Sequence, residues 1–224
     1  MAFPFIAYIS SSSYVIPVIA GITRFKRLNN AMKVFLLFCV STCAEIGGEY
    51  VLSRNHTNNA FLSNYFVLLE SAFIFTVYFL SVRSKRTKQV ISILAVFFLA
   101  LWLIDKIYFE VPNQLNAEMA VASRIFIILI SVVAIQAIAK PMTHPLIDEP
   151  IFWVSSGTVI YSTGVLLIVG LSNELLKMGR PYFNAAWYIN WALAMISNGI
   201  FTKGFFCTPK YQISSGSSVS EQRF

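Results

Sequence analysis

Long apolar runs separated by short polar segments are the main pattern of this sequence. The clearest run covers residues 61–82 and is apolar or aromatic except for Asn64, three hydroxyl side chains and one carboxylate, Glu70. A helix of that length, at about 1.5 Å per residue, matches a bilayer core of about 30 Å. Glu70 falls near its middle, where a charge costs about 2.5 to 3.5 kcal/mol, so it should face protein or water rather than lipid.

Six further runs have a similar length, and the composition agrees with them. Hydrophobic residues make up 57% of the chain and charged residues 12%, whereas a soluble domain carries about 25% charged residues. We therefore predict an all-α fold, a polytopic membrane bundle at residues 1–207 followed by a Ser-rich, disordered cytoplasmic tail at 208–224. The seven predicted transmembrane helices cover residues 3–22, 34–52, 61–82, 89–109, 118–139, 151–172 and 185–206.

Basic residues are concentrated after the first and third predicted helices, and this distribution predicts the orientation. By the positive-inside rule both segments are cytoplasmic, which places the N-terminus outside and the C-terminus inside. The segment 173–184 is then an outer loop, although it also carries basic residues. The net charge of +7 arises largely from these clusters at helix ends and so does not indicate a nucleic-acid partner. The clusters are Arg24, Lys26, Arg27 and Lys33, and Arg83, Lys85, Arg86 and Lys88.

Several polar and aromatic residues fall in the middle or outer half of the predicted membrane region. If the bundle gathers them, they line an outward-facing polar cavity, which is the usual functional site of a membrane bundle. Acids outnumber bases among them, so at least one carboxylate should be neutral or exchange protons, which favours a cation or a proton over an anion. The candidate residues are Glu45, Glu49, Glu70, Asp105, Arg124, Tyr161, Trp187, Asn190 and Trp191.

A purely structural role for the same residues is the main alternative. Arg124 would then pair with Glu49 or Asp105, and a protonated Glu70 would bond a serine or an asparagine, so that the group only fixes helix packing. Likewise, Trp187 and Trp191, one turn apart, suit interface anchoring as well as ligand stacking.

The sequence lacks the residues that characterise several classes of membrane enzyme and cofactor-binding protein. A retinal protein needs a lysine within its last helix, but Lys203 is near the cytoplasmic end. A zinc hydrolase of the seven-helix ceramidase type needs intramembrane histidines, whereas His56 and His144 fall in predicted loops. No nucleophile elbow, HExxH or phosphate-binding loop occurs, so we expect no cofactor and no metal. A carboxylate-based intramembrane enzyme using Glu45 and Glu70 stays open.

Three features together resemble a group of small seven-helix membrane proteins common in Bacteroidota. They are the basic loop after the first helix, the central acid in the segment from Asn64 to Glu70, and the segment Asp148-Glu149-Pro150-Ile151-Phe152-Trp153 followed by Gly157 and Tyr161. The resemblance covers nearly the whole chain. It implies the fold and a bacterial inner membrane, and it implies no activity.

These observations support three hypotheses for function. The first is a non-enzymatic sensor in which a small solute or a proton acts near Glu45, Glu70 and Arg124, and the basic loops pass the change to a cytoplasmic or membrane protein partner. The second is a proton-coupled small-solute transporter, whose topology would be analogous to that of the seven-helix SWEET-like transporters. The third is the carboxylate-based enzyme.

Overall fold

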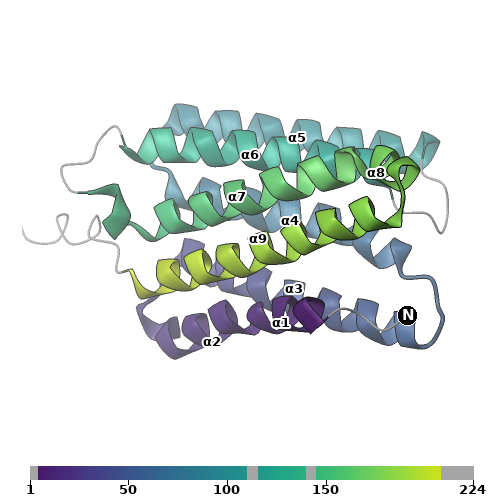
Figure 1. Ribbon diagram of the computed structural model, residues 1–224. Helices are drawn as coiled ribbons and strands as arrows, with labels where there is room; N and C mark the ends of the chain where they lie inside the picture. Colours follow the sequence, from purple (N-terminus) through teal and green to yellow (C-terminus); the bar gives the residue numbers. More distant parts are fainter. Residues whose placement is uncertain (1–4, 110–115, 140–144, 208–224) are drawn as a thin grey trace, which may run out of the picture.

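The computed structural model describes residues 5–109, 116–139 and 145–207. Its regular elements in these ranges are helices, and the long ones lie side by side in one bundle (Figure 1), which confirms the predicted all-α class. The elements are α1 Phe5–Ser13, α2 Val15–Arg24, η1 Phe25–Arg27, α3 Asn30–Arg54, α4 Ala60–Ser81, α5 Lys85–Tyr108, α6 Ala117–Ala139, η2 Leu146–Asp148, α7 Pro150–Gly170, α8 Ser172–Met178 and α9 Arg180–Phe206.

Within the described residues, six helical segments are long and apolar enough to cross a membrane, as expected of an integral membrane protein. They are α1 to η1 taken together, α3, α4, α5, α6 and α7. α9 has a similar length and packs in the same bundle, but its first half carries tyrosine, tryptophan and asparagine side chains that lower its hydropathy. The prediction of an outer loop at 173–184 was wrong in part, because α8 occupies the beginning of that segment and α9 begins at Arg180.

Among the described residues, the long helices form a closed ring with one of them, α5, outside it. The main contacts run from α2 to α3, then to α4, α6, α7 and α9, and α9 returns to α1 and α2. α5 packs on the outside of this ring, mainly against α4 and α6. The ring of its Phe98 lies 5.8 Å from that of Phe75 and 5.5 Å from that of Phe126. The ring of six therefore surrounds the interior, and α5 does not reach it.

The first span is broken between α1 and α2, and Pro17 explains the break. Proline has no N–H to donate to the carbonyl of Ser13 four residues earlier, and its ring crowds that carbonyl. α1 ends at Ser13 and α2 begins at Val15, which leaves Tyr14 at the junction. The carbonyl of Tyr14 accepts a hydrogen bond from the thiol of Cys43 on α3, at 3.5 Å. The break thus positions an aromatic side chain at mid-bundle.

Local sequence signals set several helix starts. Asn29 caps α3 by accepting from the N–H of Met32 at 2.9 Å, and Ser84 caps α5 through the N–H of Thr87. α7 begins with Pro150, whose missing N–H costs nothing in a first turn. Gly179, with φ of 110°, makes the turn that separates α8 from α9, a backbone conformation that glycine adopts readily.

Close packing between α7 and α9 depends on two glycines of α7. A side chain at Gly157 would meet the ring of Phe201, and one at Gly164 would meet Leu193. Small residues spaced along a helix let a neighbouring helix approach closely, which is how helices commonly associate in membranes.

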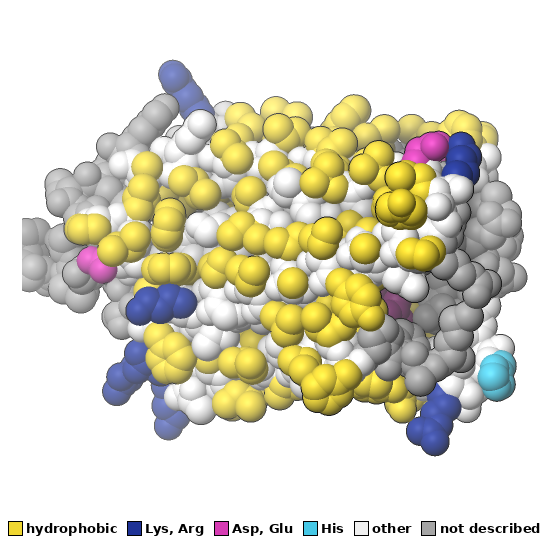
Figure 2. Space-filling model, viewed as in Figure 1, with side chains coloured by type: hydrophobic (Ala, Val, Ile, Leu, Met, Phe, Trp, Pro, Cys, Tyr) yellow, Lys and Arg dark blue, Asp and Glu magenta, His cyan; other side chains and the backbone are white. Residues whose placement is uncertain are grey.

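The charged residues lie mainly at the two ends of the bundle, with apolar side chains between them. Figure 2 shows lysine and arginine gathered at the end where α2 ends and α3 begins, which is also where α4 ends, α5 begins and α9 ends (Figure 1). Both basic clusters of the sequence therefore lie at one end, called here the basic end. Tail residues 208–224 lie outside the described residues.

Candidate functional site

A buried ion pair joins α4 to α6 inside the ring. Arg124 donates from Nη1 and Nη2 to the two carboxylate oxygens of Glu70, each at 2.6 Å. Glu70 is 5% exposed and Arg124 is 9% exposed. Two parallel, charge-assisted hydrogen bonds are a strong and geometrically specific arrangement. The structural alternative predicted other partners. Arg124 does not pair with Glu49 or Asp105, and Glu70 bonds Arg124 and not a serine or an asparagine.

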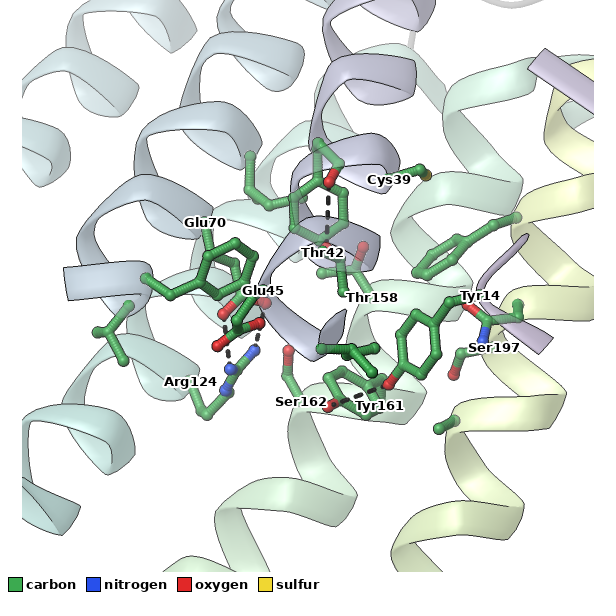
Figure 3. A pocket seen from close by; sticks show the side chains of 18 of the residues that line it. Tyr14, Cys39, Thr42, Glu45, Glu70, Arg124, Thr158, Tyr161, Ser162 and Ser197 are labelled. Atoms are coloured by element: carbon green, nitrogen blue, oxygen red, sulfur yellow. Dashed lines mark hydrogen bonds and ion pairs between the residues drawn. The ribbon is translucent and has the colours of Figure 1, made fainter. Parts of the chain in front are cut away.

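Two tyrosines extend this pair across the interior. The guanidinium carbon of Arg124 lies 5.5 Å from the ring centroid of Tyr161 on α7, within the range of a cation–π interaction. The hydroxyl of Tyr14, at the break in the first span, is 3.5 Å from that of Tyr161. Figure 3 shows the two tyrosines meeting at their hydroxyls beside the ion pair.

A cavity of about 240 Å³ lies against this group and is lined by residues from every segment of the ring. Tyr14 and Pro17 contribute from the first span, and α5 contributes nothing to the described lining. Its other polar lining residues are Thr42, Glu45, Glu49, Ser63, Glu70, Arg124, Thr158, Tyr161, Ser162, Ser197 and Asn198.

The cavity is closed by aromatic side chains toward the basic end. Phe38 and Phe201 line it, and Phe35 packs behind them with ring centroids 5.6 Å from Phe38 and 5.0 Å from Phe201. Phe205 lies 5.6 Å from Phe35 on the same side. In contrast, Glu49 and Ser63 lie near the opposite end of the bundle, where α3 ends and α4 begins. The polar part of the cavity is thus directed away from the basic end.

Glu45 and Glu49 face the cavity from one side of α3 because they are one helical turn apart. Glu49 accepts a hydrogen bond from the hydroxyl of Ser63 on α4. The Glu45 carboxyl interacts electrostatically with Glu49, Glu70 and Arg124, and no hydrogen bond or ion pair joins it to another described residue. Glu70 already occupies both terminal nitrogens of Arg124, so the cavity carries an excess of acid groups.

Two almost fully buried serine hydroxyls that line the cavity have no hydrogen-bond partner among the described residues. Ser162 on α7 and Ser197 on α9 are each 1% exposed, and their Oγ atoms are unpaired. Nε of Arg124 is unpaired as well. A buried hydroxyl without a partner costs about 1 to 3 kcal/mol. These atoms lie in the cavity wall with almost no exposed surface, so a molecule in the cavity would reach them only after a small movement of the side chains around them.

The other candidate residues lie elsewhere in the bundle. Asp105, on the peripheral α5, accepts a hydrogen bond from the side chain of Asn116. Trp187 and Trp191 pack against each other with ring centroids 6.3 Å apart, and Asn190 lies between them in sequence on α9. These four are not among the described residues that line the cavity.

Asn116 connects three helices and was not singled out in the sequence. Its side chain caps α6 by accepting from the N–H of Met119 at 2.9 Å and donates to Asp105. Its backbone N–H donates to the side chain of Asn64 on α4, at 3.0 Å. Asn116 thereby joins α4, α5 and α6 at the end opposite the basic clusters.

Some cavity residues had weak signals in the sequence. Tyr14 is three residues before Pro17, and a proline within a span marks a possible break there. Thr158 and Ser162 belong to the polar stripe of α7 at helical spacing. Thr42, beside Ser41, and Ser63 belong to no such stripe, and the sequence gives no signal for them. In the described residues, no group of three or more His, Cys, Asp or Glu side chains is placed to hold a metal ion.

Comparison with known proteins gives no match. No protein-family model matches the chain, and neither a curated protein nor a solved structure matches it. The role of the chain is therefore inferred from the geometry of the cavity.

Proposed function

We propose that this chain is a membrane-embedded, receptor-like binding protein that takes a small solute or a proton into the cavity beside Glu70 and Arg124. The observation that carries the proposal is the cavity itself, which every ring segment lines and in which Glu45, Ser162 and Ser197 have no hydrogen-bond partner in the described structure. An interior meant only for packing would satisfy or omit such groups.

The orientation is part of the proposal. The positive-inside rule applied to the basic end places that end in the cytoplasm, the N-terminus outside and the cavity open to the outside. The aromatic side chains of Phe35, Phe38 and Phe201 then close the cavity from the cytoplasm. A bacterial inner membrane rests on the resemblance of the sequence alone.

A route from the cavity to the cytoplasmic surface supports a sensing role. α9 lines the cavity with Ser197 and Asn198 and ends at Phe206. There Arg24, in the first basic cluster, donates to the carbonyl of Phe206 at 3.1 Å and lies 5.3 Å from the centroid of its ring. A shift of α9 on ligand binding would move this basic cluster, which is the expected contact for a protein partner.

A proton-coupled transporter is the second candidate, and the break at Tyr14 favours it. Transporters commonly place their substrate sites where a transmembrane helix is interrupted. A carboxylate-based enzyme is less well supported, because both oxygens of Glu70 are occupied by Arg124.

The proposal is tested by thermal unfolding of the purified protein in detergent against a broad metabolite set and across pH. We expect at least one solute, or a change of pH, to raise the unfolding midpoint of the wild type. Ala194→Leu, which fills the cavity, should abolish that response, whereas Ala44→Leu, at an exposed position of α3, should keep it. No response in the wild type, or an equal response in both variants, would contradict a cavity ligand. Flux of the ligand into proteoliposomes then separates transport from sensing.

A further inference from the structure

The groups without partners in the cavity identify the class of solute, if the proposed function holds. The Glu45 carboxyl is available for a positive charge, and Ser162 and Ser197 place hydroxyls without partners in the cavity wall, where a small side-chain movement would bring them to polar atoms of a ligand. All three face the same space from three different helices, α3, α7 and α9. A ligand that engages them would bridge opposite sides of the ring.

The charge balance of the cavity selects against an anion. Arg124 is the basic residue of the described lining, and Glu70 binds both of its terminal nitrogens. Unless it broke that bidentate pair, an incoming anion would find only Nε of Arg124 without a partner, and it would face Glu45 and Glu49 as well. A cation, in contrast, relieves the repulsion between these acid groups, and opposite charges attract strongly where water is partly excluded.

The size and the apolar lining favour an organic ion over an inorganic one. A cavity of about 150 Å³ accommodates benzene, so about 240 Å³ corresponds to roughly ten non-hydrogen atoms. Phe38, Phe66 and Ile74 contribute carbon surface to the lining. The ring of Tyr161 adds an aromatic face, although Arg124 already lies over it.

We infer that the cavity binds a small organic amine in its ammonium form, with one or more hydroxyl groups. The ammonium group pairs with the carboxylate of Glu45, and the hydroxyl groups hydrogen-bond to Ser162 and Ser197. The inference rests on the proposed function and names the chemistry of its ligand.

The experiment compares probes that differ in one group, with thermal unfolding and calorimetry as readouts, in phosphate buffer at constant ionic strength. Tris(hydroxymethyl)aminomethane and ethanolamine are the ammonium probes. Their neutral counterparts are pentaerythritol, which has a hydroxymethyl group in place of the amine of tris(hydroxymethyl)aminomethane, and ethylene glycol, which has a hydroxyl in place of the amine of ethanolamine. Glycolate tests an anion, and sodium chloride tests an inorganic cation. We expect binding of the ammonium probes to be at least tenfold tighter than that of their neutral counterparts.

Three variants locate the site. Glu45→Gln should weaken ammonium binding at least tenfold, while Glu118→Gln, at an exposed position of α6, should leave it unchanged. Ser162→Ala should weaken binding of the hydroxylated amines more than that of propylamine. Glu45→Asp keeps the charge and should retain part of the binding, which separates loss of the carboxylate from misfolding.

The contrary outcomes are distinct. Equal binding of neutral or anionic probes, an equal response to sodium chloride, or ammonium binding that persists in Glu45→Gln would overturn the inference. If the ammonium probes fail while the broad metabolite set yields another cavity ligand, the inference is wrong and the proposed function stands. If no solute and no pH change gives a response, both are wrong.

Discussion

Arg124 on α6 binds both carboxylate oxygens of Glu70 on α4, and this pair lies within the ring of helices and not between the ring and lipid. Each residue compensates the charge of the other in a place where neither would be stable alone. The cost of breaking such a pair comes from the partner that remains buried.

Glu70→Gln should therefore destabilise the protein by about 3 to 5 kcal/mol, since Arg124 would keep its charge without a counter-ion. Arg124→Met should have a similar effect. The double variant Glu70→Met, Arg124→Met should recover most of the loss, because no charge is left unpaired. Denaturant unfolding in detergent micelles measures all three. A Glu70→Gln protein as stable as the wild type would show that the pair does not hold α4 to α6.

Removal of an unpaired cavity hydroxyl should affect stability and binding in opposite directions. Ser162→Ala removes a buried group with no partner, so we expect it to be neutral or to stabilise the protein by about 1 kcal/mol. Ser131→Ala is the control, because Ser131 contacts the hydroxyl of Tyr78 at 2.7 Å and donates to the carbonyl of Ile127. It should destabilise the protein by about 1 to 2 kcal/mol. Unfolding midpoints that reverse this order would argue against available hydroxyls in the cavity.

Two glycines should respond differently to the same substitution. Gly157→Ala would place its methyl group about 2.5 Å from the ring of Phe201, and such overpacking costs about 1 to 3 kcal/mol. Gly199→Ala, with open space at its Cβ position on α9, should be neutral or stabilise by up to about 1 kcal/mol. Adding Phe201→Leu to Gly157→Ala should relieve part of the clash. Equal effects at the two glycines would mean that α7 and α9 are not closely packed there.

Asn116 should contribute more to the stability of the protein than an ordinary residue at the start of a helix. Asn116→Ala removes the cap of α6 and the bond to Asp105, so we expect a loss of about 1 to 3 kcal/mol in unfolding free energy. Asn116→Asp keeps a capping oxygen but brings a second carboxylate to Asp105. Because the two like charges repel, that variant should be less stable than the wild type despite its intact cap. An Asn116→Asp protein as stable as the wild type would contradict the contact.

Orientation in the membrane can be measured with a membrane-impermeant maleimide on intact cells. His56→Cys should react from outside, and Ser84→Cys should react only after permeabilisation. Cys207→Ser is the background for both. In the wild type the Cys207 thiol should react slowly, because burial raises the pKa of Cys207 above its ordinary value and lowers its thiolate fraction. The opposite labelling pattern would invert the cavity and place its polar end in the cytoplasm.

Much of the helical architecture could be predicted from the sequence, since an apolar run of sufficient length has few alternatives in a bilayer. The position of α8 could not, because Ser172–Met178 is too short and polar to give a membrane signal, although Glu174 and Lys177 are spaced to pair on a helix. The outside position of α5 was equally hidden, because its sequence is as apolar as that of the ring helices.

The pairing of Arg124 with Glu70 could have been predicted by comparing how deep each residue lies in the membrane. α4 and α6 begin at the same end of the bundle (Figure 1), and at about 1.5 Å per residue Glu70 lies only about 4 to 5 Å deeper than Arg124, within reach of a long side chain. Depth alone also placed Asp105 and Trp187 near the site. Asp105 and Trp187 do not line the cavity because α5 is outside the ring and because α9 is rotated so that other residues face the interior. Both properties depend on packing between helices.

The closure of the ring has a consequence for how the protein is made. α9, the most C-terminal helix of the described residues, completes the ring by packing against α1 and α2, the most N-terminal ones, so the two sides of that contact are far apart along the chain. The Glu70–Arg124 pair needs only α4 and α6 and is available earlier in synthesis. Until α9 has left the ribosome and inserted, the interior hydroxyls and acids on α3 and α7 have no wall on one side. The bundle must therefore keep a polar groove open for the time taken to synthesise α9.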